Sequence, residues 1–209
     1  MDRGKEYVDQ LVWRLMKVSA PKVMVLLVLT TIWSMDSLPE ELNLQALERL
    51  QWCEFFAGQA EATKAFKANR FTTADLLYMN AAPGKQNPMD ICSDAGFVTA
   101  IATVLMEDDI TGRLCHFGLK CAKFTTINTG TSGRSACSAI GNLHHRSVLE
   151  GNRMASRVVL LILLVVCCNG TFLLEQPAQS FLEYYPRFRD LLEALASTGG
   201  RHCVPRLLY

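Results

Sequence analysis

The chain has almost no excess of charge of either sign, so its overall charge says little about its partners. Its 209 residues include 21 lysines and arginines against 20 aspartates and glutamates, a formal net charge of +1. This balance selects neither nucleic acid nor an acidic membrane surface. The distribution is less even, because residues 111–157 contain seven basic residues against one acid, Glu150. That stretch is therefore suited to face an anion.

The sequence also lacks the spacings that hold metal ions. Its eight cysteines form no Cys-x-x-Cys pair and make no ligand cluster with the four histidines. Cys167 and Cys168 lie inside an apolar run, which is typical of buried reduced thiols and not of a disulfide framework. We therefore predict no metal site.

No apolar run reaches the about 20 residues that a helix needs to cross a bilayer. The runs at 23–33 and 158–168 have eleven residues each. The first could be the core of a targeting segment, but eight charged residues precede it and no small-x-small cleavage pattern follows. We interpret it as a buried or interfacial segment, and the second as part of a buried core. We expect an intracellular protein, nuclear or cytoplasmic. In the alternative, a membrane-associated or secreted chain, Asn169-Gly170-Thr171 would be a glycosylation sequon.

Strand and helix patterns alternate from residue 44 onward. Strands are expected at 52–57, 72–77, 114–117 and 172–175, and helices at 44–50, 60–69, 93–106, 153–168 and 186–196. The helix that ends near Cys168 is expected to be capped by Asn169-Gly170. Loops are expected at 81–87 and, rich in glycine, serine and threonine, at 125–142. The alternation predicts an α/β domain over 46–209 with a mostly parallel sheet, preceded by an N-terminal extension over 1–45.

One strand end carries a turn that is suited to bind a ligand. After Glu54, the small residues Gly58 and Ala60 allow a tight change from strand to helix that leaves backbone N–H groups open. Asp75 follows 17 residues after Gly58 and is expected at the end of the next strand, where an acid can accept hydrogen bonds from ribose hydroxyls. A plain tight turn and a solvated acid explain these residues equally well.

Glu175 is expected at the end of a second strand. The segments around Glu54 and Glu175 together resemble a known family. Residues Glu54-Phe55-Phe56-Ala57-Gly58-x-Ala60 resemble the first motif of class I S-adenosylmethionine-dependent methyltransferases, in the form that DNA cytosine-5 methyltransferases use. Leu119–Phe124 resembles their Pro-Cys motif, and Leu174-Glu175-Gln176-Pro177 resembles their Glu-Asn-Val motif. Residues 130–135 and Gly151-Asn152 also resemble an uncharacterised methyltransferase-like family of protist proteins.

The resemblance, which covers roughly residues 50–190, implies a fold, a cofactor and a chemistry. The fold would be a Rossmann-like three-layer sandwich, partly truncated, and the cofactor S-adenosylmethionine. The residues implied to bind the cofactor are Glu54, Phe56, Gly58, Ala60, Asp75 and Asp90. Cys121 would attack C6 of a cytosine ring, and Glu175 would hold the base at N3 and the exocyclic amine. We accordingly expect Gly58, Asp75 and Glu175 to lie at one edge of the sheet.

The sequence departs from the family's pattern in ways that leave a second interpretation open. Lys120 stands where the family has proline before the cysteine, Gln176 replaces asparagine, and Ala60 replaces the second glycine of the turn. Because only 19 residues follow Asp190 in this sequence, we expect no target-recognition domain here. The alternative is a catalytically degraded Rossmann-fold binding module, in which Cys121 is a small residue of the core.

The basic stretch has two interpretations as well. In the family, the segment after the cysteine is a loop that closes over substrate, so Lys123, Arg134 and Arg146 would meet a nucleic-acid phosphate or another anion. Without interleaved aromatic residues, the same stretch reads as a solvated loop.

Overall fold

The computed structural model describes residues 51–56, 60–71, 73–77, 90–105, 113–119 and 121–197. The chain divides into two compact units, and each is described by itself. The first unit comprises Met1–Gly118 and Leu161–Leu173, and the second comprises Leu119–Leu160 and Leu174–Tyr209. The expectations for residues 1–45, 44–50 and 81–87 fall outside the described residues.

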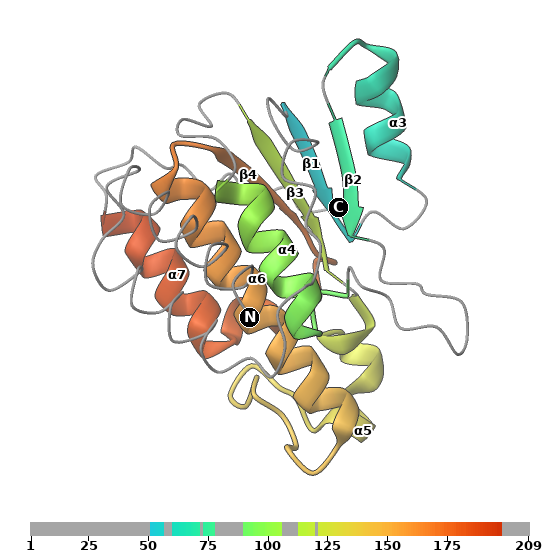
Figure 1. The fold of residues 1–209 in the computed structure, drawn as a ribbon. Helices are drawn as coiled ribbons and strands as arrows, with labels where there is room; N and C mark the ends of the chain where they lie inside the picture. Colours follow the sequence, from blue (N-terminus) through green and yellow to red (C-terminus); the bar gives the residue numbers. More distant parts are fainter. Residues whose placement is uncertain are drawn as a thin grey trace, which may run out of the picture. The chain divides into compact units, whose positions relative to one another are not determined.

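A four-stranded sheet organises the first unit (Figure 1). Its strands are β1 (Trp52–Phe55), β2 (Thr73–Leu77), β3 (Leu114–Gly118) and β4 (Thr171–Glu175), in the order β2-β1-β3-β4. β1 pairs in parallel with β2 on one side and with β3 on the other. The chain therefore places β2 on one side of β1 and then places β3 on the other side, so the strand order reverses at β1.

Two helices of the first unit cover the sheet. Helix α3 (Glu61–Ala68) packs on β1 and β2, and α4 (Asp94–Leu105) follows the chain on from Ser93 and contacts β2. Figure 1 shows α3 and α4 on opposite sides of the sheet. All four residues of β1 are buried, as a strand covered on both faces requires. The predicted α/β class is confirmed.

Helix α4 begins at a tight junction that only glycine fits. The Ser93 hydroxyl caps the helix by accepting the backbone N–H of Gly96 at 3.0 Å. A Cβ atom on Gly96 would lie 2.1 Å from the carbonyl oxygen of Asp90. The absence of a side chain at Gly96 therefore fixes how closely the Asp90 turn approaches α4.

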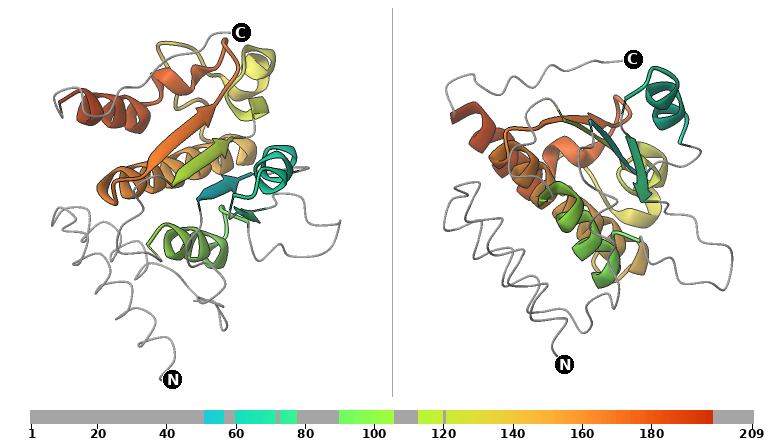
Figure 2. Two further views of the ribbon diagram at one scale, coloured as in Figure 1. Left: turned by 90° about the horizontal axis from the view of Figure 1, so that it is seen from above. Right: turned by 45° about the horizontal axis from the view of Figure 1, so that its top comes forward.

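The second unit contains several short helices (Figure 2). They are η2 (Cys121–Lys123), η3 (Thr126–Asn128), α5 (Thr129–Ser132), η4 (Phe181–Tyr184) and α7 (Pro186–Ser197). The long helix α6 (Arg146–Cys167) belongs to this unit up to Leu160 and to the first unit from Leu161. The expected loop at 125–142 thus contains η3 and α5, and the helix expected from residue 153 begins at Arg146.

The C-terminal cap of α6 is the one that the sequence predicts. Asn169 has a φ of 61°, and the N–H groups of Asn169 and Gly170 donate to the carbonyls of Val166 and Val165 at 3.1 and 2.9 Å. This is the Schellman arrangement, in which the residue with positive φ is usually glycine.

Substituting Asn169→Gly should therefore raise the free energy of unfolding by about 0.5 kcal/mol, because glycine adopts positive φ without steric cost. Asn169→Val should lower it by more than 1 kcal/mol, since a branched side chain is strained in that conformation. Urea denaturation of the three proteins measures both values. Equal stability of the glycine and valine variants would contradict the cap.

Candidate functional site

Two residues with positive φ lie in the connection between β1 and α3, one at each end of residues 57–59, which are outside the described residues. Phe56, the residue after β1, has a φ of 65°, and Ala60, the residue before α3, has a φ of 54°. Each non-glycine residue in this left-handed region costs about 1–2 kcal/mol. Ala60 also occupies the position where the resembled motif has its second glycine, so the backbone there has the conformation that favours glycine. Gly58 itself lies outside the described residues.

Glu54 lies inside the first unit and holds α3 against β1. Its Oε2 accepts the backbone N–H of Thr63 at 2.8 Å and the Thr63 hydroxyl at 2.5 Å. On β3, His116 is the register partner of Glu54, and its Nδ1 lies 3.8 Å from Oε1. Glu54 as a whole residue is 6% exposed. Its described hydrogen bonds therefore join α3 to β1, and direct contact of Glu54 with a cofactor stays a prediction.

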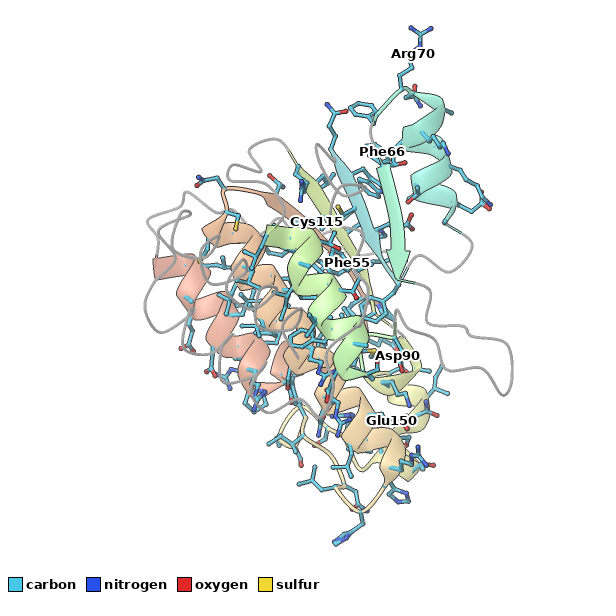
Figure 3. The ribbon with its side chains drawn as sticks, viewed as in Figure 1. Phe55, Phe66, Arg70, Asp90, Cys115 and Glu150 are labelled. Atoms are coloured by element: carbon cyan, nitrogen blue, oxygen red, sulfur yellow. The ribbon has the colours of Figure 1, made fainter. Side chains whose placement is uncertain are left out.

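The same junction is completed by aromatic packing. Trp52 donates its indole N–H to the Thr63 hydroxyl at 3.1 Å. Its ring stacks on Phe66 of α3 with centroids 3.9 Å apart (Figure 3), and Phe66 meets Phe71 edge-on at 5.4 Å. Hydrogen bonds and stacked rings thus fix the first two turns of α3, and with them the residue at which the strained turn ends.

Thr63→Val should lower the free energy of unfolding by about 2 kcal/mol, because it removes a buried hydrogen bond to a carboxylate and the acceptor of the Trp52 N–H. Thr63→Ser keeps the hydroxyl and should cost less than about 1 kcal/mol, the value of a buried methyl group. Chemical denaturation of both variants separates the hydroxyl from packing. If serine destabilises as much as valine, the hydroxyl does not hold α3.

The two aspartates expected at the cofactor are placed differently. Asp75 is the third residue of the five-residue β2, and its side chain lies outside the described residues. Asp90 lies before α4, where its Oδ1 accepts the backbone N–H of Cys92 at 2.9 Å (Figure 3). The Asp90 carbonyl accepts Ser93 N–H at 2.8 Å. The described contacts of Asp90 therefore shape its own turn.

The segments that carry Cys121 and Glu175 are hydrogen-bonded to each other within the second unit. Gln176 donates its amide N–H to the Leu119 carbonyl at 3.3 Å, and Phe181 N–H donates to the Phe124 carbonyl at 2.7 Å. An isolated antiparallel bridge joins Thr125 to Ser180. Two segments more than 50 residues apart in sequence thus run side by side.

Within these segments, the two candidate catalytic residues occupy strand-end positions. Cys121 is the first residue of η2, three residues after β3 ends, and its side chain lies outside the described residues. Glu175 is the last residue of β4 and is exposed. The resemblance implies that this carboxylate holds the base, and that role stays a prediction.

The Arg134 side chain is buried in the second unit, and its contact with an anion stays a prediction. It is only 2% exposed, and its guanidinium donates to the carbonyls of Ala139, Ile140 and Val148 and to Oδ1 of Asn152. It also lies 4.1 Å above the ring of Phe124. Burial lowers the pKa of the Arg134 guanidinium from its usual value. The backbone carbonyls that it binds show that it organises the loop.

Lys123 and Arg146 share a single acid. Lys123 Nζ and Arg146 Nε each lie 3.2 Å from a different carboxylate oxygen of Glu150. Partial burial acts to raise the pKa of Glu150, but these hydrogen bonds and charges outweigh it and hold that pKa below its usual value. The Arg146 side chain is 93% exposed, so of the three basic candidates it is the one best placed to reach an anion.

Three cysteines of the first unit, Cys53, Cys115 and Cys168, are buried. Cys53 and Cys115 are register partners on β1 and β3, and both are buried and free of disulfides. A hydrogen bond with Cys53, together with burial, raises the pKa of Cys115 well above its usual value. Burial likewise raises the pKa of Cys168 to about 12. These thiols therefore belong to the core.

The sequence and the structure were compared with known families, proteins and solved structures. No family model, no curated protein and no solved structure matches the chain. Within the described ranges, no group of three or more His, Cys, Asp or Glu residues could hold a metal ion. Across that same part of the chain, no helix has both the length and the apolar character needed to span a membrane.

Sequence reasoning did not identify several residues that shape the candidate site. His116 could have been found by aligning β1 with β3, since it lies opposite Glu54. Thr63 could have been suspected because it faces the strand from the first turn of the following helix. The contact between Gln176 and Leu119 spans 57 residues, and no local pattern signals it.

Proposed function

We propose that the chain is an S-adenosylmethionine-dependent methyltransferase-like protein whose first unit binds the cofactor at the carboxyl end of β1. The observation that carries this proposal is the sheet order, in which β1 has parallel neighbours β2 and β3 on opposite sides. Ligands of open α/β sheets bind beyond the carboxyl ends of the strands at such a switch point. The strained residues Phe56 and Ala60 lie at this point, where non-glycine residues with positive φ are often linked to function.

The fold that accompanies this proposal is Rossmann-like. Three features support it: the parallel pairing of β1 with both neighbours, α3 and α4 on opposite sides of the sheet, and the motif order along the chain. In the resembled family the first motif follows one strand, the cysteine a second and the glutamate a third. Here the corresponding residues follow β1, follow β3 and end β4, with β3 next to both β1 and β4.

The reaction that we propose is methyl transfer to a nucleic-acid base. The Cys121 thiolate would add to C6 of a cytosine ring, and the electron pair that reaches C5 would then take the methyl group from the sulfonium. Methyl transfer would break the bond between the methyl carbon and sulfur and so form S-adenosylhomocysteine; water would then take the C5 proton as the S–C6 bond breaks, which restores the ring and the thiolate. Glu175 would balance the charge that develops on the base. Hydrogen bonds between the two segments that carry these residues support this assignment.

A cofactor-binding module without turnover is the second candidate, and one contact favours it. Lys123 would stabilise a neighbouring thiolate, but its ammonium group lies 3.2 Å from Oε2 of Glu150. A charge that is already paired lowers the pKa of a nearby thiol less than an unpaired one.

Two measurements on the purified chain test these candidates. Calorimetry with S-adenosylmethionine and with S-adenosylhomocysteine should show saturable binding of both. Transfer of labelled methyl groups to mixed DNA and RNA, with Cys121→Ser as the control, then separates enzyme from module. Binding with transfer that Cys121→Ser abolishes supports the enzyme, and binding with no transfer supports the module. No binding of either compound would refute both.

A further inference from the structure

The amide of Gln176 is held in a defined orientation within the second unit. Its Oε1 accepts the hydroxyl of Ser180 at 2.9 Å, and that hydroxyl oxygen in turn accepts Leu182 N–H at 3.2 Å. Ser180 is 8% exposed. Because Oε1 is engaged in this way, Nε2 is directed to the carbonyls of Leu119 at 3.3 Å and Glu175 at 2.9 Å.

A second side-chain amide holds the chain on the other side of Cys121. Asn128 donates from Nδ2 to the Ala122 carbonyl at 2.5 Å. Leu119 lies two residues before Cys121 and Ala122 one residue after it. The backbone on both sides of the cysteine is therefore restrained through carbonyls that bond to the amides of Gln176 and Asn128.

These contacts restrain the backbone next to Cys121, where the sequence lacks the proline of the resembled family. In the resembled family, a proline before the cysteine restricts the backbone, and Lys120 at that position gives no such restriction. Gln176, which also departs from the family's pattern, bonds to the residue just before Lys120. The two departures thus lie on directly contacting segments, and one supplies a restraint that the other removes.

We infer that Gln176 and Asn128 are positioning residues that fix the backbone of Cys121 for attack on the substrate. The inference rests on the proposed function, because it assigns to Cys121 the role of nucleophile. Neither amide touches the reacting atoms in this account; each acts through a backbone carbonyl. A nucleophile displaced by about 1 Å reacts on the order of a hundredfold more slowly, so loss of either restraint should be visible in the rate.

The test compares neutral variants that remove one amide each. Gln176→Met and Asn128→Leu should lower kcat for methyl transfer at least tenfold while the KM for S-adenosylmethionine changes less than twofold. Both should also raise deuterium uptake by backbone amides of residues 119–124. Asn128 is exposed, so its variant is expected to fold even if Gln176→Met does not.

The matched control is Gln179→Met, the same substitution three residues later. Gln179 is exposed and bonds through Oε1 to the Thr126 hydroxyl at 3.2 Å, away from the Leu119 and Ala122 carbonyls. It should leave kcat within twofold of wild type. Wild-type kcat in Gln176→Met and Asn128→Leu would overturn the inference alone. A wild-type chain that binds cofactor or DNA but transfers no methyl group would overturn the nucleophilic role of Cys121, and this inference with it.

Discussion

Arg134→Met should lower the free energy of unfolding by about 2–4 kcal/mol, because buried backbone carbonyls lose the donor that satisfies them in wild type. The guanidinium binds Ile140 O at 3.1 Å, Val148 O at 3.4 Å and Asn152 Oδ1 at 2.9 Å, besides the carbonyl of Ala139. Methionine fills much of the volume but donates no hydrogen bond. The buried carbonyls of Ala139 and Val148 would therefore lose this donor, each at a cost of about 1–3 kcal/mol before relaxation, whereas the Ile140 carbonyl keeps its bond from Asn152 Nδ2 at 3.0 Å.

Urea denaturation of wild type, Arg134→Met and Arg153→Met measures this effect. Arg153 lies on an exposed position of α6, and no ion pair of its side chain is found among the described residues. The same substitution there should change stability by less than about 0.5 kcal/mol. If both substitutions lower the free energy of unfolding by the same small amount, Arg134 does not organise the loop. Binding of an anion by Arg134 would then be the better explanation.

Gly58→Val should weaken S-adenosylmethionine binding more than a hundredfold while the chain stays folded. Gly58 lies in sequence between Phe56 and Ala60, two residues that already have positive φ. A ligand that receives hydrogen bonds from such a turn must approach the backbone closely, and a branched side chain blocks that approach. The valine variant is compared with wild type by calorimetry, and its fold by circular dichroism.

Gly130→Val is the matched control for this substitution. A Cβ on Gly130 would meet nothing within 4 Å, and the residue is exposed in the second unit. The control variant should bind S-adenosylmethionine as wild type does. If Gly58→Val and Gly130→Val bind S-adenosylmethionine with equal affinity, the cofactor does not bind at Gly58, whatever the stability of either variant.

Much of the fold could be predicted because its strands and helices have strong local signals. β1, β2, β3 and β4 all fall within a residue or two of their predicted positions, and so do α3, α4 and α7. In the sequence, each is a mostly apolar run or a helical pattern bounded by turn residues. Asn169 and Gly170 likewise form the predicted cap, because their preference for positive φ is local.

The remaining features depend on contacts that sequence alone does not reveal. Helix α6 begins at Arg146, seven residues before the predicted start at residue 153. The prediction missed these residues because most of them are polar or exposed and so show no apolar pattern. Arg134 reads as a loop cation, yet distant carbonyls and Phe124 hold it in the interior. The sequence around Glu54 predicts a ligand-binding acid, but the Glu54 carboxylate accepts hydrogen bonds from Thr63, nine residues later.

Photo-crosslinking tests the proposed cofactor site most directly. The chain is irradiated with methyl-tritiated S-adenosylmethionine, digested with trypsin and analysed for the labelled peptide. Cleavage after Arg49 and Lys64 releases residues 50–64, which contain β1, the strained turn and the start of α3. We predict saturable label in that peptide, displaced by excess S-adenosylhomocysteine and absent in Gly58→Val. Label that is not displaced, or that is found only in other peptides, would contradict cofactor binding at the carboxyl end of β1.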